Sequence, residues 1–528
     1  MSIMIFSSKQ KFFTHFASRY IMAGVLLSTP LVILLMMSWL IAGRVIYSLD
    51  DPYIHLALAK QIANGHYGIN PGSYSAPSSS LLWPFLLAPW AWLGDYFDTV
   101  PLIINWGCTV ATGLFIWNFL KSIHPWGIAT LQTTLIMFGL NIWGVAFTGM
   151  EHSLQLLMAA VIASSLIKAR YSWYFWLSIT LLPWVRYEGL AITLPTLTWI
   201  AWQFSQGTSA PNDSKNTLSA AIFSLLISLG GLAIFSIWLH SVNLGWMPSS
   251  ILSKTGGLFD STPDLEILEG AIANAHHQSF NLTGQLLLVL TSINACLAFY
   301  QKKWSWGSLV IILPAILHMI FGQFGWFGRY ENYALLYQVI ITFGTTQWLN
   351  QLTKALLLGI IFIMASPLWV CTQLTPGAMK NIWEQQWQMS LIARELNAPI
   401  AVNDLGLVAL HSQQPVLDLW GLGSIEALNA RKSRAPNDLW IEALMTRHQT
   451  EFAFVYDSWF HHLPAGWIPV AQMVLQSPPV SVGGTRVTLY ATNNKATQKL
   501  LSAIISYSEK NPTQARSLLI NPTLLTSQ

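Results

Sequence analysis

Charged residues are scarce in this chain. Its 528 residues include 26 Lys and Arg and 22 Asp and Glu, so that 9% are charged, where a soluble globular domain has about 25%. So few charges cannot cover a surface that faces water on all sides, which excludes a cytosolic globular enzyme and a disordered chain. The net charge of +4 is also too small to indicate a nucleic-acid partner.

Cysteine is rare as well. The three cysteines stand in apolar runs without paired spacing (Cys108, Cys296 and Cys371). Isolated cysteines of this kind are most often packing residues, so we expect neither a disulfide framework nor a cysteine metal site. The sequence also lacks a Walker loop, a glycine-rich dinucleotide loop, a HExxH helix and a GxSxG elbow. Nothing in it therefore supports a soluble nucleotide as a substrate.

Long apolar runs are what the chain has in abundance. Hydrophobic residues make up 53% of it, and it has 26 Trp, a residue that favours bilayer interfaces. A bilayer core takes about 20 apolar residues per helix. Runs of this kind extend from residues 21–43 to residues 355–372 and predict a polytopic α-helical membrane protein with about 10 to 12 transmembrane helices. The run 173–203 contains Arg186 and Glu188, which indicates two short segments joined at depth.

The charge is uneven along the chain. Residues 1–374 hold 27 of the charged residues, and the much shorter stretch 375–528 holds 21. From residue 375, short β-type runs alternate with segments of helical spacing. The β-type runs are IAVNDLGLVAL, PVLDLW, EFAFVYD and SVGGTRVTLYAT, and the helical ones are SIEALNA and DLWIEALMTRH. We therefore predict a membrane domain at residues 1–374 and a C-terminal α/β soluble domain at residues 375–528.

Basic residues between the apolar runs indicate which side of the membrane each loop faces. Lys168, Arg170, Lys302, Lys303 and Lys354 are expected to be cytoplasmic anchors, because basic residues favour that side of a membrane. Three cations before the first apolar run favour a cytoplasmic N-terminus. An odd number of spans would then place the C-terminal domain outside.

Two acidic clusters lie where the apolar runs end. Burial of an ionisable group at membrane depth costs free energy, so each such group is a candidate site residue. Asp50 and Asp51 follow the first run and precede Tyr53. They form either a general base with a neighbouring carboxylate or a solvated turn that caps the next helix. Glu151, at the edge of a later run, either holds a substrate hydroxyl or caps a helix.

Cations form the remaining clusters. Arg186 and Glu188 are two residues apart, so on a helix they would point to different sides and need separate partners, or else an unwound segment. Lys254, in the polar stretch 241–280, is either a phosphate ligand or an ordinary exposed lysine. Arg329 suits a phosphate by its planar fork of donors, or it extends to the interface. Together, the acidic pair and the cations suit a lipid-phosphate donor with an anionic leaving group.

The order of these clusters resembles that of the GT-C polytopic glycosyltransferases, and most of all their mycobacterial arabinofuranosyltransferase-like branch. The elements that carry the resemblance cover most of residues 20–430 in the same order. They are Asp50-Asp51-Pro-Tyr53-Ile54, Gly68-Ile-Asn70-Pro71-Gly72, Gly149-Met-Glu151, Arg186-Tyr-Glu188-Gly189, Pro248-Ser-Ser-Ile-Leu-Ser-Lys254, Gly328-Arg329-Tyr330, Asn403-Asp404-Leu-Gly406 and Asp418-Leu-Trp-Gly421-Leu422. Tyr187 and Ser249 depart from the proline and asparagine that are usual in the family.

The resemblance implies an inverting transfer of a sugar from a polyprenyl-phosphate donor. The acceptor would be an envelope glycan, a glycolipid or a protein at the outer face of the bacterial inner membrane, with no nucleic acid involved. Asp50 would be the general base with Asp51 beside it, and a divalent metal ion near Asp50 and Glu151 is left open. The substrate-binding residues that it implies are Tyr53, Glu151, Arg186, Glu188, Lys254, Arg329 and Tyr330.

Two other classes compete with this interpretation. A secondary transporter would also bury Arg186 and Glu188, but it predicts inverted repeats, and the sequence contains none that we detect. A lipid-linked glycan ligase or polymerase would share the spans and the outer cations. It would not explain a carboxylate pair directly after the first span.

Overall fold

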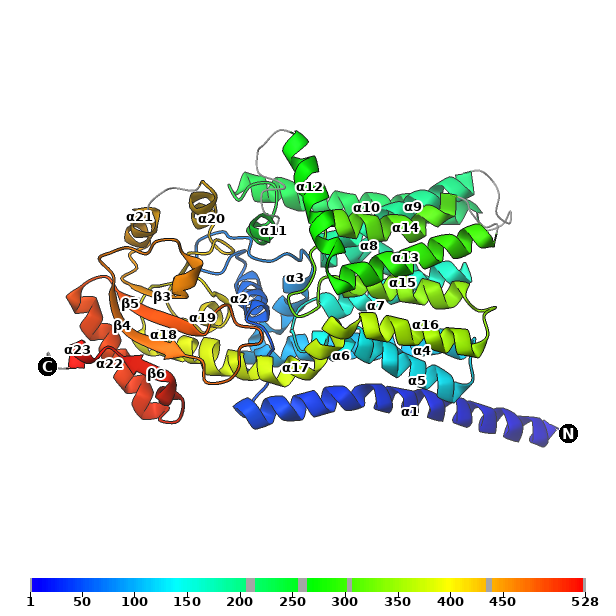
Figure 1. The fold of residues 1–528 in the computed structure, drawn as a ribbon, viewed down its shortest axis with the longest axis horizontal. Coiled ribbons are helices and arrows are strands. Elements are labelled where there is room, and N and C mark those ends of the chain that lie inside the picture. Colours follow the sequence, from blue (N-terminus) through cyan, green and yellow to red (C-terminus); the bar gives the residue numbers. More distant parts are fainter. Residues whose placement is uncertain (1, 206–213, 255–263, 302–305, 434–438, 526–528) are drawn as a thin grey trace.

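The chain folds into a long bundle of helices joined at one end to a small α/β unit (Figure 1). This computed structural model describes residues 2–205, 214–254, 264–301, 306–433 and 439–525. Lys302 and Lys303, two of the expected anchors, lie outside the described residues, as does the side chain of Lys254.

Most helices of the bundle run along its length, side by side (Figure 1). They are α1 (Ser2–Ala42), α4 (Val100–Lys121), α5 (Trp126–Gly139), α7 (His152–Lys168), α8 (Trp173–Val185), α9 (Leu190–Ser205), α10 (Ser214–Ser241), α13 (Leu282–Tyr300), α14 (Leu309–Phe321), α15 (Asn332–Thr345), α16 (Gln351–Met364) and α17 (Ser366–Ile382). Shorter elements connect them, namely α2 (Asp51–Ala63), α3 (Trp83–Leu87), η1 (Ala88–Thr99), α6 (Ile142–Ala146), η2 (Tyr187–Gly189), α11 (Ser249–Lys254), α12 (Asp264–Ser279) and η3 (Trp306–Ser308).

The outward faces of these helices are apolar. On α1, α10 and α16, large side chains such as Leu40, Phe223 and Ile363 are exposed, a surface that suits lipid better than water. Within the described residues, four helices are long and apolar enough to span a membrane, and a bent pair, Gln351–Met364 with Ser366–Leu396, makes a fifth. Several others are apolar but shorter. The count of about 10 to 12 spans stays a prediction.

The predicted break in the run 173–203 is confirmed. Helix α8 ends at Val185, and Arg186 is extended, with φ −154° and ψ 139°. The short η2 follows, and α9 begins at Leu190. Because the backbone is not helical at this point, the side chains of Arg186 and Glu188 do not point apart. They form an ion pair with each other.

The C-terminal unit, which we define as residues 388–525, is built on one mixed six-stranded sheet. Its strands are β1 (Ile400–Val402), β2 (Val416–Asp418), β3 (Phe452–Val455), β4 (Ile468–Val474), β5 (Arg486–Ala491) and β6 (Leu518–Ile520), in the order β2-β1-β3-β5-β4-β6. Strands β2, β1 and β3 are parallel, and the other pairs are antiparallel. In the register of the parallel strands, Ala401 lies beside Leu417 and Ala453.

Side chains alternate between the two faces of this sheet, as strand geometry requires. Val402 and Phe454 pack in one apolar cluster with α18 (Gln388–Leu396) and α22 (Asn494–Lys510). Ala401 and Val455 pack in another with α20 (Ile425–Lys432) and α21 (Leu439–Arg447). The remaining elements are η4 (Trp383–Trp387), α19 (Gly406–His411), η5 (Asp457–Trp459), η6 (Gln514–Ser517) and α23 (Pro522–Leu525).

The predicted strand segments PVLDLW, EFAFVYD and SVGGTRVTLYAT are confirmed as β2, β3 and β5, and the two helical segments as α20 and α21. Of the predicted strand segment IAVNDLGLVAL, only Ile400–Val402 is a strand (β1), because its second half forms helix α19 (Gly406–His411). Strands β4 and β6 were not predicted. Pro469 interrupts the alternation of β4, and the pairing of β4 with β5 shifts beside it, a position where a strand tolerates proline. Helix α17 passes through residue 375 without a break, so the predicted domain boundary falls within a helix.

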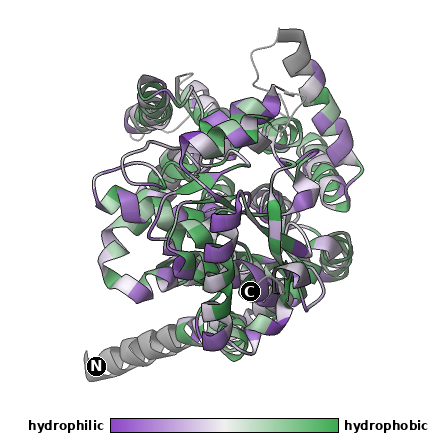
Figure 2. Cartoon of the chain, turned by 90° about the vertical axis from the view of Figure 1, so that its left-hand side faces the viewer, coloured by the Kyte–Doolittle hydropathy of each residue, from purple (hydrophilic) through white to green (hydrophobic). Residues whose placement is uncertain are grey.

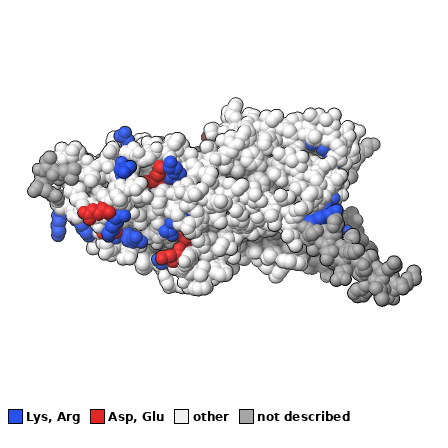
Figure 3. Space-filling model, turned by 90° about the horizontal axis from the view of Figure 1, so that it is seen from below, with Lys and Arg blue, Asp and Glu red and all other residues white. Residues whose placement is uncertain are grey.

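Charge is confined to particular parts of the molecule. Seen from below, Lys, Arg, Asp and Glu gather on the C-terminal unit, while the bundle beside it is almost free of them until its far end (Figure 3). Seen from the C-terminal end, many hydrophilic residues face the viewer (Figure 2). This distribution fits an apolar bundle in lipid that carries a unit in water.

Candidate functional site at the junction of the bundle and the C-terminal unit

A cavity of about 380 Å³ lies where the bundle meets the C-terminal unit. We call it the junction cavity. The bundle contributes Asp50, Asp51, Arg329 and Tyr330 to its wall, together with other residues, and the C-terminal unit contributes Asn403, Asp404, Trp420, Trp459, Ser481 and Gly483. It is of the size of small-molecule sites in proteins, which begin near about 300 Å³.

Asp50 joins the two halves of this cavity. One carboxylate oxygen accepts a hydrogen bond from the backbone N–H of Gly406 at 2.5 Å, and the other accepts one from Leu407 at 2.9 Å. A Cβ at residue 406 would lie 2.1 Å from the Asp50 carbonyl oxygen, so only glycine permits this approach. Each carboxylate oxygen keeps a second acceptor site.

A second carboxyl group lies beside Asp50. Asp404 follows β1 and accepts hydrogen bonds from the Gln386 side chain at 2.7 Å and from the Tyr456 hydroxyl at 3.3 Å. Burial raises the pKa of Asp404 to about 6. Burial also raises the pKa of Asp50, and the Asp404 charge adds to this, while the two backbone N–H groups oppose it. Two carboxyl groups so close together favour a shared proton.

Arg329 holds the other side of the junction cavity. Its guanidinium donates to the Asp51 carboxylate at 3.1 Å and to the Tyr330 hydroxyl at 2.9 Å. The Arg329 side chain is 1% exposed, whereas that of Asp51 is 22% exposed. The Nε of Arg329 has no hydrogen-bond partner within the described part of the chain. A donor on this cation is therefore available to an anionic ligand.

The loop before Arg329 has an unusual backbone. Gly325, Trp326, Phe327 and Gly328 all have positive φ values, which non-glycine residues adopt at a cost of about 1–3 kcal/mol each. The loop is fixed by the side chain of Asn141, which donates to the Phe327 carbonyl at 2.9 Å. Such strain persists only where surrounding contacts over-determine it, and it accumulates at functional sites.

A second cavity, of about 310 Å³, lies within the bundle and is mostly apolar. We call it the bundle cavity. Its polar wall contains Ser79, Arg186 and Glu188, and Gln323 lines both cavities. The Tyr330 ring lies close to both arginines. The Arg329 guanidinium is 4.9 Å and the Arg186 guanidinium 5.2 Å from the centroid of this ring.

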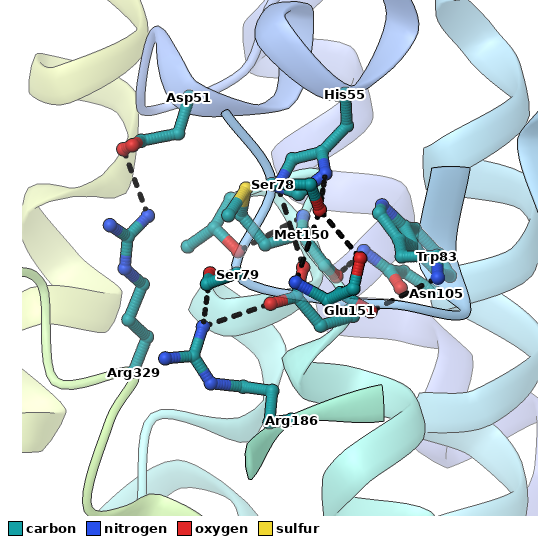
Figure 4. A network of polar contacts seen from close by, with 12 residues as sticks. Asp51, His55, Ser78, Ser79, Trp83, Asn105, Met150, Glu151, Arg186 and Arg329 are labelled. Carbon is teal, nitrogen blue, oxygen red and sulfur yellow. Dashed lines mark hydrogen bonds and ion pairs between the residues drawn. The ribbon is translucent and has the colours of Figure 1, made fainter. Parts of the chain in front are cut away.

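Arg186 is the centre of a buried polar network (Figure 4). Its guanidinium donates to Glu151 at 2.9 Å, to Glu188 at 2.6 and 3.1 Å, and to Ser79 at 3.2 Å. On the other side of Glu151, the His55 ring lies 3.7 Å from its carboxylate. One cation between two carboxylates satisfies charges that would otherwise be costly to bury.

The structure thus brings most of the predicted site residues into two connected sites. Asp50, Asp51, Arg329 and Tyr330 line the junction cavity, and Arg186 and Glu188 line the bundle cavity. Glu151 lies behind Arg186. Tyr53 is buried, and its hydroxyl accepts a hydrogen bond from the backbone N–H of Tyr47 at 3.1 Å, so its contact is with the protein itself. Lys254 ends α11.

Three residues of the junction cavity have no predicted role from the sequence, namely Asp404, Trp420 and Trp459. A signal for Asp404 was present in the sequence, because Asn403 and Asp404 directly follow a strand. Side chains at this position gather at the end of a parallel sheet. The position of Asp50 beside that sheet end was not visible in the sequence.

Among the described residues there is no group of three or more His, Cys, Asp or Glu that could hold a metal ion. Asp50 binds backbone N–H groups, and Glu151 binds Arg186. The two residues for which a divalent ion was left open therefore have other partners.

Comparison with known proteins gives a partial match. A family model described as a domain of unknown function (DUF8728) matches residues 380–490, and no curated protein matches the chain. Among solved structures, the oligosaccharyltransferase of Archaeoglobus fulgidus in complex with Zn and sulfate has a TM-score of 0.48 at 13% identity, over 81% of this chain and 68% of that one.

Two further structures of the same archaeal protein are similar. The apo form has a TM-score of 0.43 at 11% identity, over 81% of this chain and 69% of that one. The form tethered to an acceptor peptide with the NVT sequon has a TM-score of 0.44 at 13% identity, over 81% and 68%. These comparisons do not show the arabinofuranosyltransferase branch, which stays a prediction.

The contact between Asp50 and Gly406 generates a prediction about stability. We expect Gly406→Ala to lower the free energy of unfolding by about 1–3 kcal/mol, because the new methyl group must displace the Asp50 backbone. This loss of stability is measured by thermal unfolding of the purified full-length protein. Gly466→Ala is the matched control in the same unit, since a Cβ there meets nothing within 4 Å. Equal unfolding midpoints for the two variants would contradict the close approach.

Proposed function

We propose that this protein is a membrane glycosyltransferase of the GT-C type, which moves a sugar from a polyprenyl-phosphate donor to an acceptor hydroxyl with inversion. The observation that carries the proposal is the junction cavity, which combines the carboxylates of Asp50, Asp51 and Asp404 with Arg329 and shares a lining residue with an apolar cavity inside the bundle. A lipid-linked, anionic donor needs both kinds of surface at once.

The apolar side extends along the bundle. A groove of about 560 Å³ between α9 and α14 is lined by Trp199, Trp202, Leu309 and Leu313, among others, and shares Leu194 and Leu317 with the bundle cavity. Gln323 connects the bundle cavity with the junction cavity. These shared residues support a continuous path, on which the lipid tail lies along α9 and α14 and the phosphate reaches Arg329.

The proposed reaction follows from the residues around the junction cavity. Asp50 accepts the proton of the acceptor hydroxyl, and that oxygen bonds to C1 of the donor sugar. The bond between C1 and the phosphate oxygen breaks, and its electron pair leaves with the polyprenyl phosphate. Arg329, with Lys254 as the family resemblance implies, stabilises the phosphate. Burial of Asp50 beside Asp404 raises its proton affinity, as a general base requires.

Arg186, Glu151 and Glu188 have a different role in this proposal. Arg186 makes an ion pair with each of the two carboxylates, so the three side chains hold one another in place. Arg186 and Glu188 border the bundle cavity and would position the donor sugar or acceptor through hydrogen bonds, with Glu151 orienting Arg186 from behind. Tyr330, between the two arginines, would align the phosphate with them.

Basic residues support an orientation for the protein. Lys121 and Lys168 end α4 and α7, Arg170 follows, and Lys354 lies in the first turn of α16, all at the bundle end far from the C-terminal unit (Figure 1). Among the side chains that the structure describes at this end, none is acidic. We infer from the positive-inside rule that this end is cytoplasmic, which places the junction cavity at the periplasmic face of a bacterial inner membrane.

The orientation is tested by reporters fused after Gln528. Alkaline phosphatase, which is active only outside the cytoplasm, should be active there, and green fluorescent protein exported through the same route should not fluoresce. The same reporters fused after Arg170 should give the opposite pattern. Fluorescence after Gln528 without phosphatase activity would contradict the orientation.

The transfer is tested by mass spectrometry of envelope glycans and glycolipids. A deletion strain is complemented with wild type, Asp50→Asn or Asp51→Asn. We expect a sugar increment with wild type that is absent with Asp50→Asn and strongly reduced with Asp51→Asn. The exposed Asp95→Asn is the matched control and should restore the increment.

Protein level and thermal unfolding must be equal in this comparison, because an amide at residue 50 would set an N–H against the N–H groups of Gly406 or Leu407. Asp51 has no such contact with those two groups, so its variant separates chemistry from folding. Identical glycan spectra in the deletion strain and the wild type would contradict the proposal and favour transport.

A further inference from the structure

The wall of the junction cavity on the side of the C-terminal unit is aromatic. Trp420, in the loop after β2, and Trp459, at the end of η5, both line the cavity, and both are half-buried. Their ring centroids are 4.5 Å apart, with an angle of 55° between the planes. The proposed reaction involves neither tryptophan, although both face the cavity in which it would occur.

This aromatic wall is held in place from behind. The Arg431 guanidinium lies 3.5 Å from the centre of the Trp420 ring and donates to the Trp420 carbonyl. The indole N–H of Trp459 donates to the Gly483 carbonyl at 3.0 Å. A Cβ at Gly483 would lie 2.2 Å from the Trp459 ring, so glycine is required for that contact. The two rings are therefore preorganised rather than mobile.

Two polar groups next to this wall have no partner. The Nδ2 of Asn403 and the Oγ of Ser481 are buried, line the cavity, and make no hydrogen bond with any residue that the structure describes. The orientation of the Asn403 amide is fixed, because its Oδ1 accepts a hydrogen bond from the backbone N–H of Tyr456 at 3.0 Å. Its NH₂ group is thus a donor without an acceptor. Leaving a buried donor unsatisfied costs free energy, so a ligand that pairs with it is favoured.

We propose that Trp420, Trp459, Asn403 and Ser481 form the acceptor subsite, and that the acceptor is a carbohydrate whose ring lies against the two tryptophans. This assignment rests on the proposed function. One face of a pyranose ring carries C–H groups that pack on an aromatic ring. Its hydroxyl groups both donate and accept hydrogen bonds, so one ring satisfies the Asn403 NH₂, the Ser481 hydroxyl and the nearby carboxylates of Asp50 and Asp404.

A peptide acceptor fits these groups less well. A peptide would present one hydroxyl to the general base. It lacks the adjacent hydroxyls that would pair with the Asn403 NH₂, the Ser481 hydroxyl and the two carboxylates. The position of the wall also suits an acceptor, since the two tryptophans belong to the C-terminal unit, whereas Arg329 and the bundle cavity belong to the bundle. The C-terminal unit would therefore select the acceptor, while the bundle binds the donor.

The test uses the purified, fluorescently labelled full-length protein on an array of microbial glycans, with Ser- and Thr-containing peptides printed beside them. We expect binding to a set of related glycans and not to the peptides. Trp420→Ala and Trp459→Ala should each weaken that binding about tenfold or more, as for buried aromatic anchors. Trp420→Phe should retain part of it, because a smaller aromatic face remains.

Two controls make the outcome specific. Trp173→Ala, at an exposed tryptophan near the far end of the bundle, should bind glycans like wild type. Asp95→Asn, at an exposed aspartate of the bundle outside the cavity, should bind glycans like wild type as well.

Absence of glycan binding by wild type would overturn the subsite, as would equal binding by the folded Trp420→Ala and Trp459→Ala variants. Preference for peptides would overturn the assignment to carbohydrate. If glycans bind through the two tryptophans while envelope glycans show no dependence on Asp50, the subsite stands and the proposed function fails.

Discussion

The contact of Asp50 with the backbone N–H groups of Gly406 and Leu407 is the interaction on which the site depends. The partners are 356 and 357 residues apart in the chain. They tie the loop after the first span to the start of α19 in the C-terminal unit. The junction cavity lies where these two parts meet, and both supply residues to its wall.

The same contact sets the chemistry of Asp50. Two N–H groups favour its charged form, while burial and the neighbouring Asp404 favour the protonated form. Because burial is the largest of these influences, the pKa of Asp50 lies above its ordinary value, and its carboxylate binds a proton more strongly than a solvated one. Asp51, one residue later, has a cation as its partner instead. Two adjacent carboxylates thus obtain different roles from different surroundings.

The charged groups inside the bundle also depend on specific partners. Arg186 is shared by Glu151 and Glu188, and the backbone is extended at Arg186 so that this is geometrically feasible. A continuous helix through residues 173–203 would have left both charges in lipid or forced them onto distant partners. The break therefore creates a polar wall for the bundle cavity while the rest of that cavity stays apolar.

Much of this arrangement was visible in the sequence, because composition and spacing report on local structure. The break at Arg186 followed from charge within an apolar run, and four strands followed from their alternation. The sequence did not show that Asp404 lies beside Asp50, because that proximity depends on tertiary packing between distant segments. Likewise, Trp420 and Trp459 belong to separate loops, and only the sheet order brings them into one wall.

The central claim is that the junction cavity transfers a sugar from a polyprenyl-phosphate donor. The most direct measurement uses the purified protein in liposomes with polyprenyl-phosphate sugars radiolabelled in the sugar, and follows the release of polyprenyl phosphate together with labelled product. We expect release with wild type, its loss with Asp50→Asn, and an increased KM for the donor with Arg329→Lys, which keeps the charge but not the planar fork. Equal release by the folded Asp50→Asn variant, or consumption of nucleotide sugars in place of the lipid-linked ones, would contradict it.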